Sequence, residues 1–168
     1  PEYGRITIYH VENLGVPMII YGKYGGAALR TVHLMVQNNY DHITAWDMAI
    51  FEAFGEDLGE KKQYKNNPKV TFLTLCSLGS ISCIMPIYYD TAIKTKKYVA
   101  TALDILSSKD KSTPINPDDL WQEVISACDA VASLKHNNQM DVVLTLWYAN
   151  VLNTNWASDE LELRADLL

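Results

Sequence analysis

Two lysine-rich clusters are the residues of this chain whose type and spacing are best suited to binding a ligand. The first, Lys61-Lys62-Gln63-Tyr64-Lys65, continues to Lys69, and the second is Lys94-Thr95-Lys96-Lys97-Tyr98. Grouped lysines hold phosphates or anionic lipid headgroups, at about 1 kcal/mol for each residue near a charged membrane. The alternative is that both clusters are ordinary solvated segments. We predict anionic contact surfaces at Lys61, Lys62, Lys65, Lys69, Lys94, Lys96 and Lys97.

The basic residues are concentrated in the middle of an acidic chain whose net charge is −6. Residues 1–60 hold 8 acidic and 3 basic groups, net −5, whereas residues 61–111 hold 3 acidic and 9 basic groups, net +6. Residues 112–168 hold 9 acidic and 2 basic groups, net −7. This asymmetry favours an anionic partner, or the acidic ends of a neighbouring copy, for the basic middle. Alternatively, the charges intermix in the folded molecule.

Arrangements typical of catalysis or metal binding are missing from the sequence. The glycine-rich stretch Gly22–Gly26 lacks the spacing of a phosphate-binding loop. Three cysteines without a CxxC pair, and histidines that are not at ligand spacing, argue against a zinc site and a disulfide framework. No GxSxG or Cys-His signature supports a nucleophile. We therefore expect a protein that is not an enzyme, binds no cofactor and no metal, and lies in a reducing intracellular compartment.

Tyrosines are frequent, and four of them crowd the N-terminal segment. The chain has 10 Tyr and 4 Trp, and large aromatic side chains are common anchors of protein interfaces. Trp46, Trp121 and Trp147 lie on apolar stripes and are more simply explained by packing. The N-terminal tyrosines lie outside the strongest core patterns, so we predict a self-association surface at Tyr3, Tyr9, Tyr21 and Tyr24.

Six segments have the alternation or the β-branched composition of strands. The first two are joined by a short turn, which indicates antiparallel pairing. The last segment is apolar on both faces, so a buried helix is an open alternative there. The segments are Arg5–Val11, Val16–Tyr21, Thr31–Gln37, Val70–Leu78, Ile81–Tyr89 and Asp141–Leu152.

Helices are predicted where a capping residue precedes an apolar stripe. Asp41 is placed to cap a helix that ends at Gly55 or Gly59. Asp90 is placed to cap a helix from about Thr91 to Leu106. Asn116-Pro117 is a strong start for a third, whose apolar stripe continues to Leu134. A short acidic helix after Ser158 is also compatible with the pattern.

These elements predict an α+β fold, with an antiparallel sheet of about five or six strands and two or three packed helices. At 168 residues the chain is long enough for one domain with a substantial core. We place that domain at residues 1–152 and expect residues 153–168 to form a polar acidic tail or short helix.

The order of segments between Thr31 and Ser80 resembles the core of a rhabdovirus matrix protein. The matching pieces are TVHLMVQNN, the helix to Phe54-Gly55, the basic loop KKQYKNNPK, and FLTLCSLGS, which ends in Leu78-Gly79-Ser80. The stretch MDVVLTLWYA is similar, more loosely, to a C-terminal strand of the same fold. The family's basic N-terminal region and PPxY-type motif are missing here, and the net charge is acidic.

The resemblance implies a non-enzymatic viral structural protein that self-associates and links the nucleocapsid to the envelope during assembly and budding. Its partners would be further copies of itself, the viral nucleocapsid and an anionic membrane surface. It would lie in the virion beneath the envelope and in the host cytoplasm or nucleus. The alternatives are a capsid or nucleoprotein fragment that binds RNA and, third, an intracellular enzyme.

Overall fold

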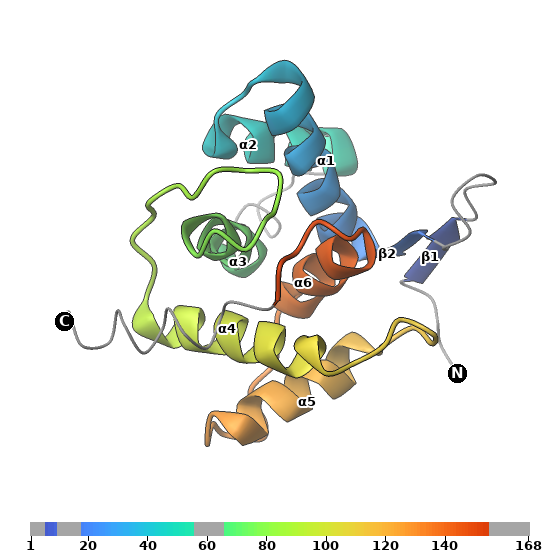
Figure 1. Ribbon diagram of the computed structural model, residues 1–168, viewed down its shortest axis with the longest axis vertical. Helices are drawn as coiled ribbons and strands as arrows, with labels where there is room; N and C mark the ends of the chain where they lie inside the picture. Colours follow the sequence, from blue (N-terminus) through green and yellow to red (C-terminus); the bar gives the residue numbers. More distant parts are fainter. Residues whose placement is uncertain (1–5, 10–17, 56–65, 155–168) are drawn as a thin grey trace.

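Helices form most of the fold in the computed structural model, which describes residues 6–9, 18–55 and 66–154 (Figure 1). Two strands form one antiparallel pair, in which Ile6 lies opposite Tyr21 and Tyr9 opposite Met18. The predicted sheet of five or six strands is therefore wrong for the described residues. The elements are β1 (Ile6–Tyr9), β2 (Met18–Tyr21), α1 (Gly22–Asn38), α2 (His42–Phe54), α3 (Asn66–Ser77), α4 (Ile93–Ser107), α5 (Pro117–Ala127) and α6 (Gln139–Tyr148).

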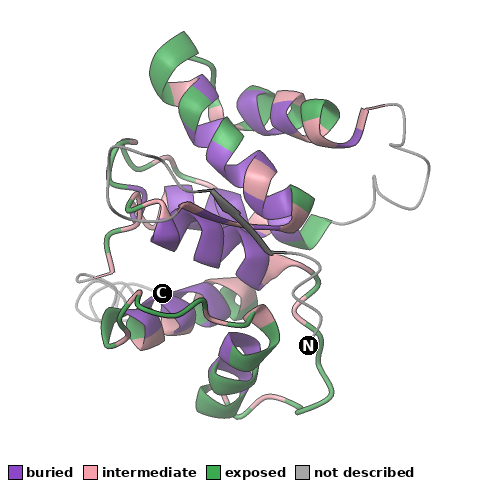
Figure 2. Cartoon of the chain, turned by 90° about the vertical axis from the view of Figure 1, so that its right-hand side faces the viewer, coloured by how far each residue is buried: buried purple, intermediate pink, exposed green. Residues whose placement is uncertain are grey.

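Helix α6 is the centre of the fold. It packs against α1, α3, α5 and β2, and every residue from Met140 to Tyr148 is buried. Buried side chains are concentrated in the inner helices, while the outer turns carry the exposed ones (Figure 2). A helix that is apolar on all sides is stable only in the interior of a protein. The buried helix left open for Asp141–Leu152 is thus the observed structure, and the strand is not.

Helix α1 occupies the segment predicted as a loop followed by the strand Thr31–Gln37. Its buried residues Tyr24, Ala28, Thr31 and Val32 recur at helical spacing along the side that faces the core. The Thr31 hydroxyl donates to the carbonyl oxygen of Ala27 at 2.7 Å, so this buried polar group is satisfied within the helix. The short alternation around Val32 concealed this longer pattern.

Helix α3 replaces the predicted strand Val70–Leu78. Residues 71–76 are all buried, between α4 and α6. A short apolar run of this kind has the same composition in a buried strand and in a buried helix. The predicted strand Ile81–Tyr89 is also wrong. Ile81 makes an isolated bridge to Leu152, and the rest of that segment is an irregular connection to α4.

The predicted helix starts at Asp41 and Asn116 are confirmed. The Asp41 carboxylate accepts from the backbone N–H groups of Ile43 and Thr44, and the Asn116 side chain accepts from Asp118 N at 2.8 Å. α2 ends at Gly55, whose φ of 56° suits glycine. Helix α4 is present as predicted, but its N-cap is Ala92 rather than Asp90, and no side chain caps it.

Helix α5 is shorter than its predicted apolar stripe. It ends at Ala127, and Asp129 adopts a left-handed φ of 52° just beyond it. Val131 and Leu134 then lie in a loop with exposed side chains. No helix in the described parts of the chain is both long and apolar enough to cross a membrane.

The Asp41 cap makes a prediction for pH dependence. Hydrogen bonding to Thr44 lowers the pKa of this carboxyl in the folded state. A lowered folded-state pKa stabilises the protein at pH above the unfolded value, and this stabilisation is lost as pH falls through the folded value. We expect Asp41→Ala to lower Tm by a few degrees at pH 7 and to match the parent at strongly acidic pH. Thermal melts by circular dichroism across pH check this, and a constant difference at every pH would contradict it.

Candidate functional site

The first lysine cluster falls mostly outside the described residues. Lys61, Lys62 and Lys65 lie in residues 56–65, of which nothing is described. Lys69 lies in the first turns of α3, where its ammonium contacts the Asp47 carboxylate of α2 at 2.8 Å. This ion pair commits Lys69 to holding two helices together, so it is a poor candidate for an external anion.

The N-terminal tyrosines do not form an exposed surface where they are described. Tyr3 is outside the described residues, and Tyr9 lies in β1, of which only the backbone is described. Tyr21 and Tyr24 are only 1% and 8% exposed. The centre of the Tyr21 ring lies 5.9 Å from that of Tyr148, and the centre of the Tyr24 ring lies 5.0 Å from that of Phe54. Tyr21 and Tyr24 are therefore core residues that a second copy cannot reach in the folded chain.

The second lysine cluster lies at the start of α4, beside exposed apolar side chains. Lys94 and Lys97 are exposed and Lys96 is half-buried. Ile93, four residues before Lys97 and on the same helix face, is 75% exposed, and Tyr88 in the preceding connection is 83% exposed. We call Tyr88, Ile93, Lys94, Lys96 and Lys97 the α4 entry surface.

The electrostatics of the α4 entry surface favour anions. Its lysines form no ion pair with any acidic side chain of the described residues. The first turn of α4 contains no acidic residue and has no side-chain cap, so its free backbone N–H groups add positive potential to that of the lysines. By contrast, Arg30, Lys69 and Lys109 each contact a carboxylate within 3 Å. Three lysines without an ion pair in the described part of the chain thus lie together at this helix start.

The other residues weighed from sequence do not assemble a reactive site. A Cβ placed on Gly22 would lie 3.4 Å from the Asp141 carboxylate, so the start of α1 faces an acid and is a poor phosphate site. Burial raises the pKa of the Cys76 thiol to about 12, opposite to the shift of a reactive cysteine. Within the described residues, no three His, Cys, Asp or Glu side chains are placed to hold a metal ion.

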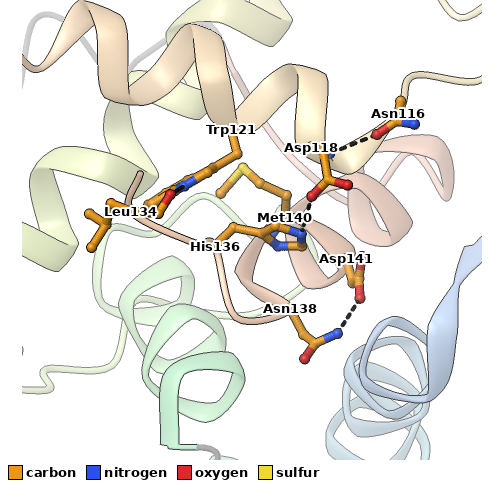
Figure 3. Close-up of polar contacts among 8 residues, drawn as sticks. All are labelled: Asn116, Asp118, Trp121, Leu134, His136, Asn138, Met140 and Asp141. Atoms are coloured by element: carbon orange, nitrogen blue, oxygen red, sulfur yellow. Dashed lines mark hydrogen bonds and ion pairs between the residues drawn. The ribbon is translucent and has the colours of Figure 1, made fainter. Parts of the chain in front are cut away.

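A polar cluster missed by the sequence analysis joins the start of α5 to the loop before α6 (Figure 3). His136 Nε2 lies 3.1 Å from Asp118 Oδ1, and His136 Nδ1 accepts from the Met140 backbone N–H at 3.4 Å. One ring nitrogen of His136 thus faces the Asp118 carboxylate and the other faces the first turn of α6. Both ring nitrogens are thus occupied, and His136 connects the two helix starts rather than acting as a free base.

The same cluster borders a cavity of about 530 Å³. Trp121 Nε1 donates to the Leu134 carbonyl oxygen at 2.6 Å, which fixes the loop against α5. One wall comes from α5, at Asp118 and, one helical turn later, at Trp121 and Gln122. The other wall is the loop over residues 132–138. A cavity of this volume lies in the size range of small-molecule sites, and most of its lining residues are polar. The sequence signal for it was weak, because the two walls are separated by about ten residues that have no recognisable motif.

Lys111, another residue missed from sequence, has a structural role. Its ammonium donates to the Trp147 carbonyl oxygen at 2.6 Å and to the Asn150 side-chain oxygen, and it lies 4.8 Å from the centre of the Trp147 ring. A cation at a helix C-terminus satisfies the last carbonyls. Burial lowers the pKa of Lys111. This lysine therefore stabilises the end of α6 and is not part of an anion-binding surface.

Comparison with known proteins places the chain in a family. A model described as "Family of unknown function (DUF6979)" matches residues 21–153. The chain belongs to that family. The match runs from the end of β2 through α6, so the family shares the helical core rather than the β1 strand. No curated protein and no solved structure matches the chain significantly.

The DUF6979 match carries no link to rhabdovirus matrix proteins. The strand, helix, basic loop and strand order that suggested the resemblance is not observed, because Thr31–Gln37 and Val70–Ser77 are helical. The viral assembly role and its location in the virion stay predictions.

Proposed function

We propose that this protein is a non-enzymatic interaction protein that binds anionic phospholipid surfaces through the α4 entry surface. The observation that carries the proposal is the juxtaposition of three unpaired lysines with exposed Tyr88 and Ile93 at an uncapped helix start. Basic residues attract the surface of an anionic bilayer, and adjacent apolar side chains enter the headgroup region. Lysine stems also allow the charged ends to reach outward from an apolar contact.

Exposed Ile93 is the feature that favours lipid over nucleic acid. An aliphatic side chain gains free energy by entering the headgroup and acyl boundary. It offers nothing to a phosphate backbone, whose recognition depends on charge and on polar groups. The overall charge of −6 opposes binding at long range, so we expect weak association that depends strongly on ionic strength.

Flotation with vesicles tests this proposal. The protein should float with phosphatidylcholine vesicles that contain phosphatidylserine, remain behind with pure phosphatidylcholine, and be released by added salt. Lys94→Glu with Lys97→Glu should weaken binding on the order of 30-fold or more, since each lysine contributes about 1 kcal/mol. Lys23→Glu with Lys135→Glu is the matched control, because it changes the net charge equally at two exposed lysines without ion pairs that lie outside the α4 entry surface.

The outcomes separate the alternatives. Equal binding by the two double variants, or no flotation of the parent at low salt, would exclude the membrane proposal. Ile93→Ser should weaken flotation while leaving any binding to a polyuridylate RNA unchanged. Salt-sensitive RNA binding without flotation would instead support the RNA-binding alternative.

A further inference from the structure

The cavity beside α5 is independent of the α4 entry surface and presents groups of both charges. Asp118 contributes a carboxylate whose side chain is 82% exposed, although one oxygen contacts His136. Lys135, also in the wall, is exposed and forms no ion pair within the described residues. Asp118 and Lys135 therefore give the wall one negative and one positive side chain. A ligand complementary to this wall has an ammonium group and a carboxylate group.

The remaining wall groups are polar and uncharged. Gln122 and Asn137 supply amide donors and acceptors, and Ser133 supplies a hydroxyl. Trp121 is only 2% exposed and its indole N–H is already bonded, so it is a floor for the cavity rather than a stacking surface. A volume of about 530 Å³ lies in the range of small-molecule sites.

The cavity is held in shape by contacts from several elements. His136 and Trp121 attach the loop to α5 and to the first turn of α6, and Asn138 Nδ2 donates to Asp141 Oδ2 at 2.8 Å (Figure 3). Asn137 and Asn138 have φ values of 49° and 66°, in the left-handed region that costs free energy for residues other than glycine. Preorganisation of this kind reduces the entropy lost on binding.

We propose that this cavity binds a small zwitterion of the amino acid or short peptide class. The ligand ammonium is placed against Asp118, its carboxylate against Lys135, and its remaining polar groups against Gln122, Ser133 and Asn137. A simple anion is disfavoured because Asp118 lines the cavity, and a metal ion is disfavoured because this carboxylate is the one acidic group in the wall. A neutral polyol would leave both wall charges without a partner of opposite sign.

Nuclear magnetic resonance titration of the full chain tests this. Glycine and glycylglycine should cause saturable shifts of the Trp121 indole N–H and of backbone amides in residues 132–138, at millimolar concentration. Acetate, methylamine and glycerol each supply one feature of the zwitterion and should shift these signals several-fold less. Stronger binding of glycylglycine than of glycine assigns the site to peptides, and the reverse order assigns it to free amino acids.

Two variants make the outcome decisive. Lys135 makes no ion pair within the described residues, so Lys135→Gln should leave the fold intact and weaken zwitterion binding at least fivefold. Asp118→Asn should weaken zwitterion binding by a similar factor. Glu123→Gln, on α5 but outside the cavity wall, is the control and should bind as the parent does. Lack of saturable shifts with either zwitterion would overturn the proposal. So would equal shifts with acetate, or affinity that neither variant changes.

Discussion

Gly25→Ala is expected to destabilise the fold by about 2–3 kcal/mol or more, although Ala is normally the better helix former. Gly25 lies in α1 where that helix crosses α6. A Cβ at this position would lie 2.1 Å from Thr145 Oγ1 and 2.9 Å from the Asp141 carbonyl oxygen. The backbone oxygen cannot move alone, so the two helices must separate. Thr145 Oγ1 also accepts from the Tyr21 backbone N–H at 2.9 Å, and the displacement would weaken that buried hydrogen bond.

The neighbouring glycine is the matched control for this experiment. A Cβ at Gly26 would meet Ile20 Cγ2 at 3.5 Å, which is an ordinary van der Waals contact. Gly26→Ala should therefore stabilise α1 by about 0.5–1 kcal/mol, because it removes the entropic cost of a helical glycine. Urea unfolding monitored by circular dichroism measures both variants. If Gly25→Ala and Gly26→Ala change the free energy of unfolding in the same direction, the close packing of α1 on α6 would be refuted.

Asp141→Ala has the second large expected effect, a loss on the order of 2–3 kcal/mol. This carboxylate is 3% exposed and accepts from Asn138 Nδ2 at 2.8 Å. It lies in the first turn of α6, and a Cβ on Gly22, the first residue of α1, would lie 3.4 Å from its Oδ2. Two helix N-termini therefore stabilise one buried negative charge.

Asp141→Asn separates charge from shape in the same position. The amide fills the same volume but carries no charge, and it presents a donor where the carboxylate had an acceptor. We expect Asp141→Asn to lose at least half as much free energy of unfolding as Asp141→Ala in the same urea experiment. An Asn variant as stable as the parent would mean that the two helix starts contribute no stabilising electrostatic interaction with this residue.

Local signals in the sequence were correct wherever one side chain satisfies the backbone nearby. Asp41 and Asn116 cap their helices as expected, because a cap depends on residues two or three positions away. The antiparallel β1–β2 pairing was also predicted, because few residues separate the two segments in the sequence. The Asp90 cap failed because α4 begins two residues later than that signal suggested.

The helices that were mistaken for strands are all short apolar segments in the sequence. Val32, Leu34 and Val36 alternate as in a strand, yet Val36 is 54% exposed while Leu34 is buried against α2. In α3 and α6 the apolar run has no polar face, so the sequence shows neither the 3.6-residue period of a helix nor the two-residue period of a strand. These segments are helical because other helices bury them from several sides. Such burial exists only in the assembled core.

The candidate sites also differ in whether the sequence alone reveals them. The α4 lysines were found from sequence, because clustered like charges are visible without a structure. The cavity was not, since Asp118 and Lys135 line the same cavity only because α5 ends at Ala127 and the following loop forms a second wall. Tyr21 and Tyr24 were misjudged, because exposure depends on the helices that cover them.

The sequence by itself determined the helix caps at Asp41 and Asn116, the N-terminal strand pair and the concentration of lysine in the middle of the chain. These features depend on neighbouring residues or on charge counts. The tertiary structure alone decided that α1, α3 and α6 are helices, that Lys69 and Lys111 have structural roles, and that the lysines at the start of α4 remain unpaired. Each of these depends on contacts between residues far apart in the chain, and such contacts form only when the helices pack around α6.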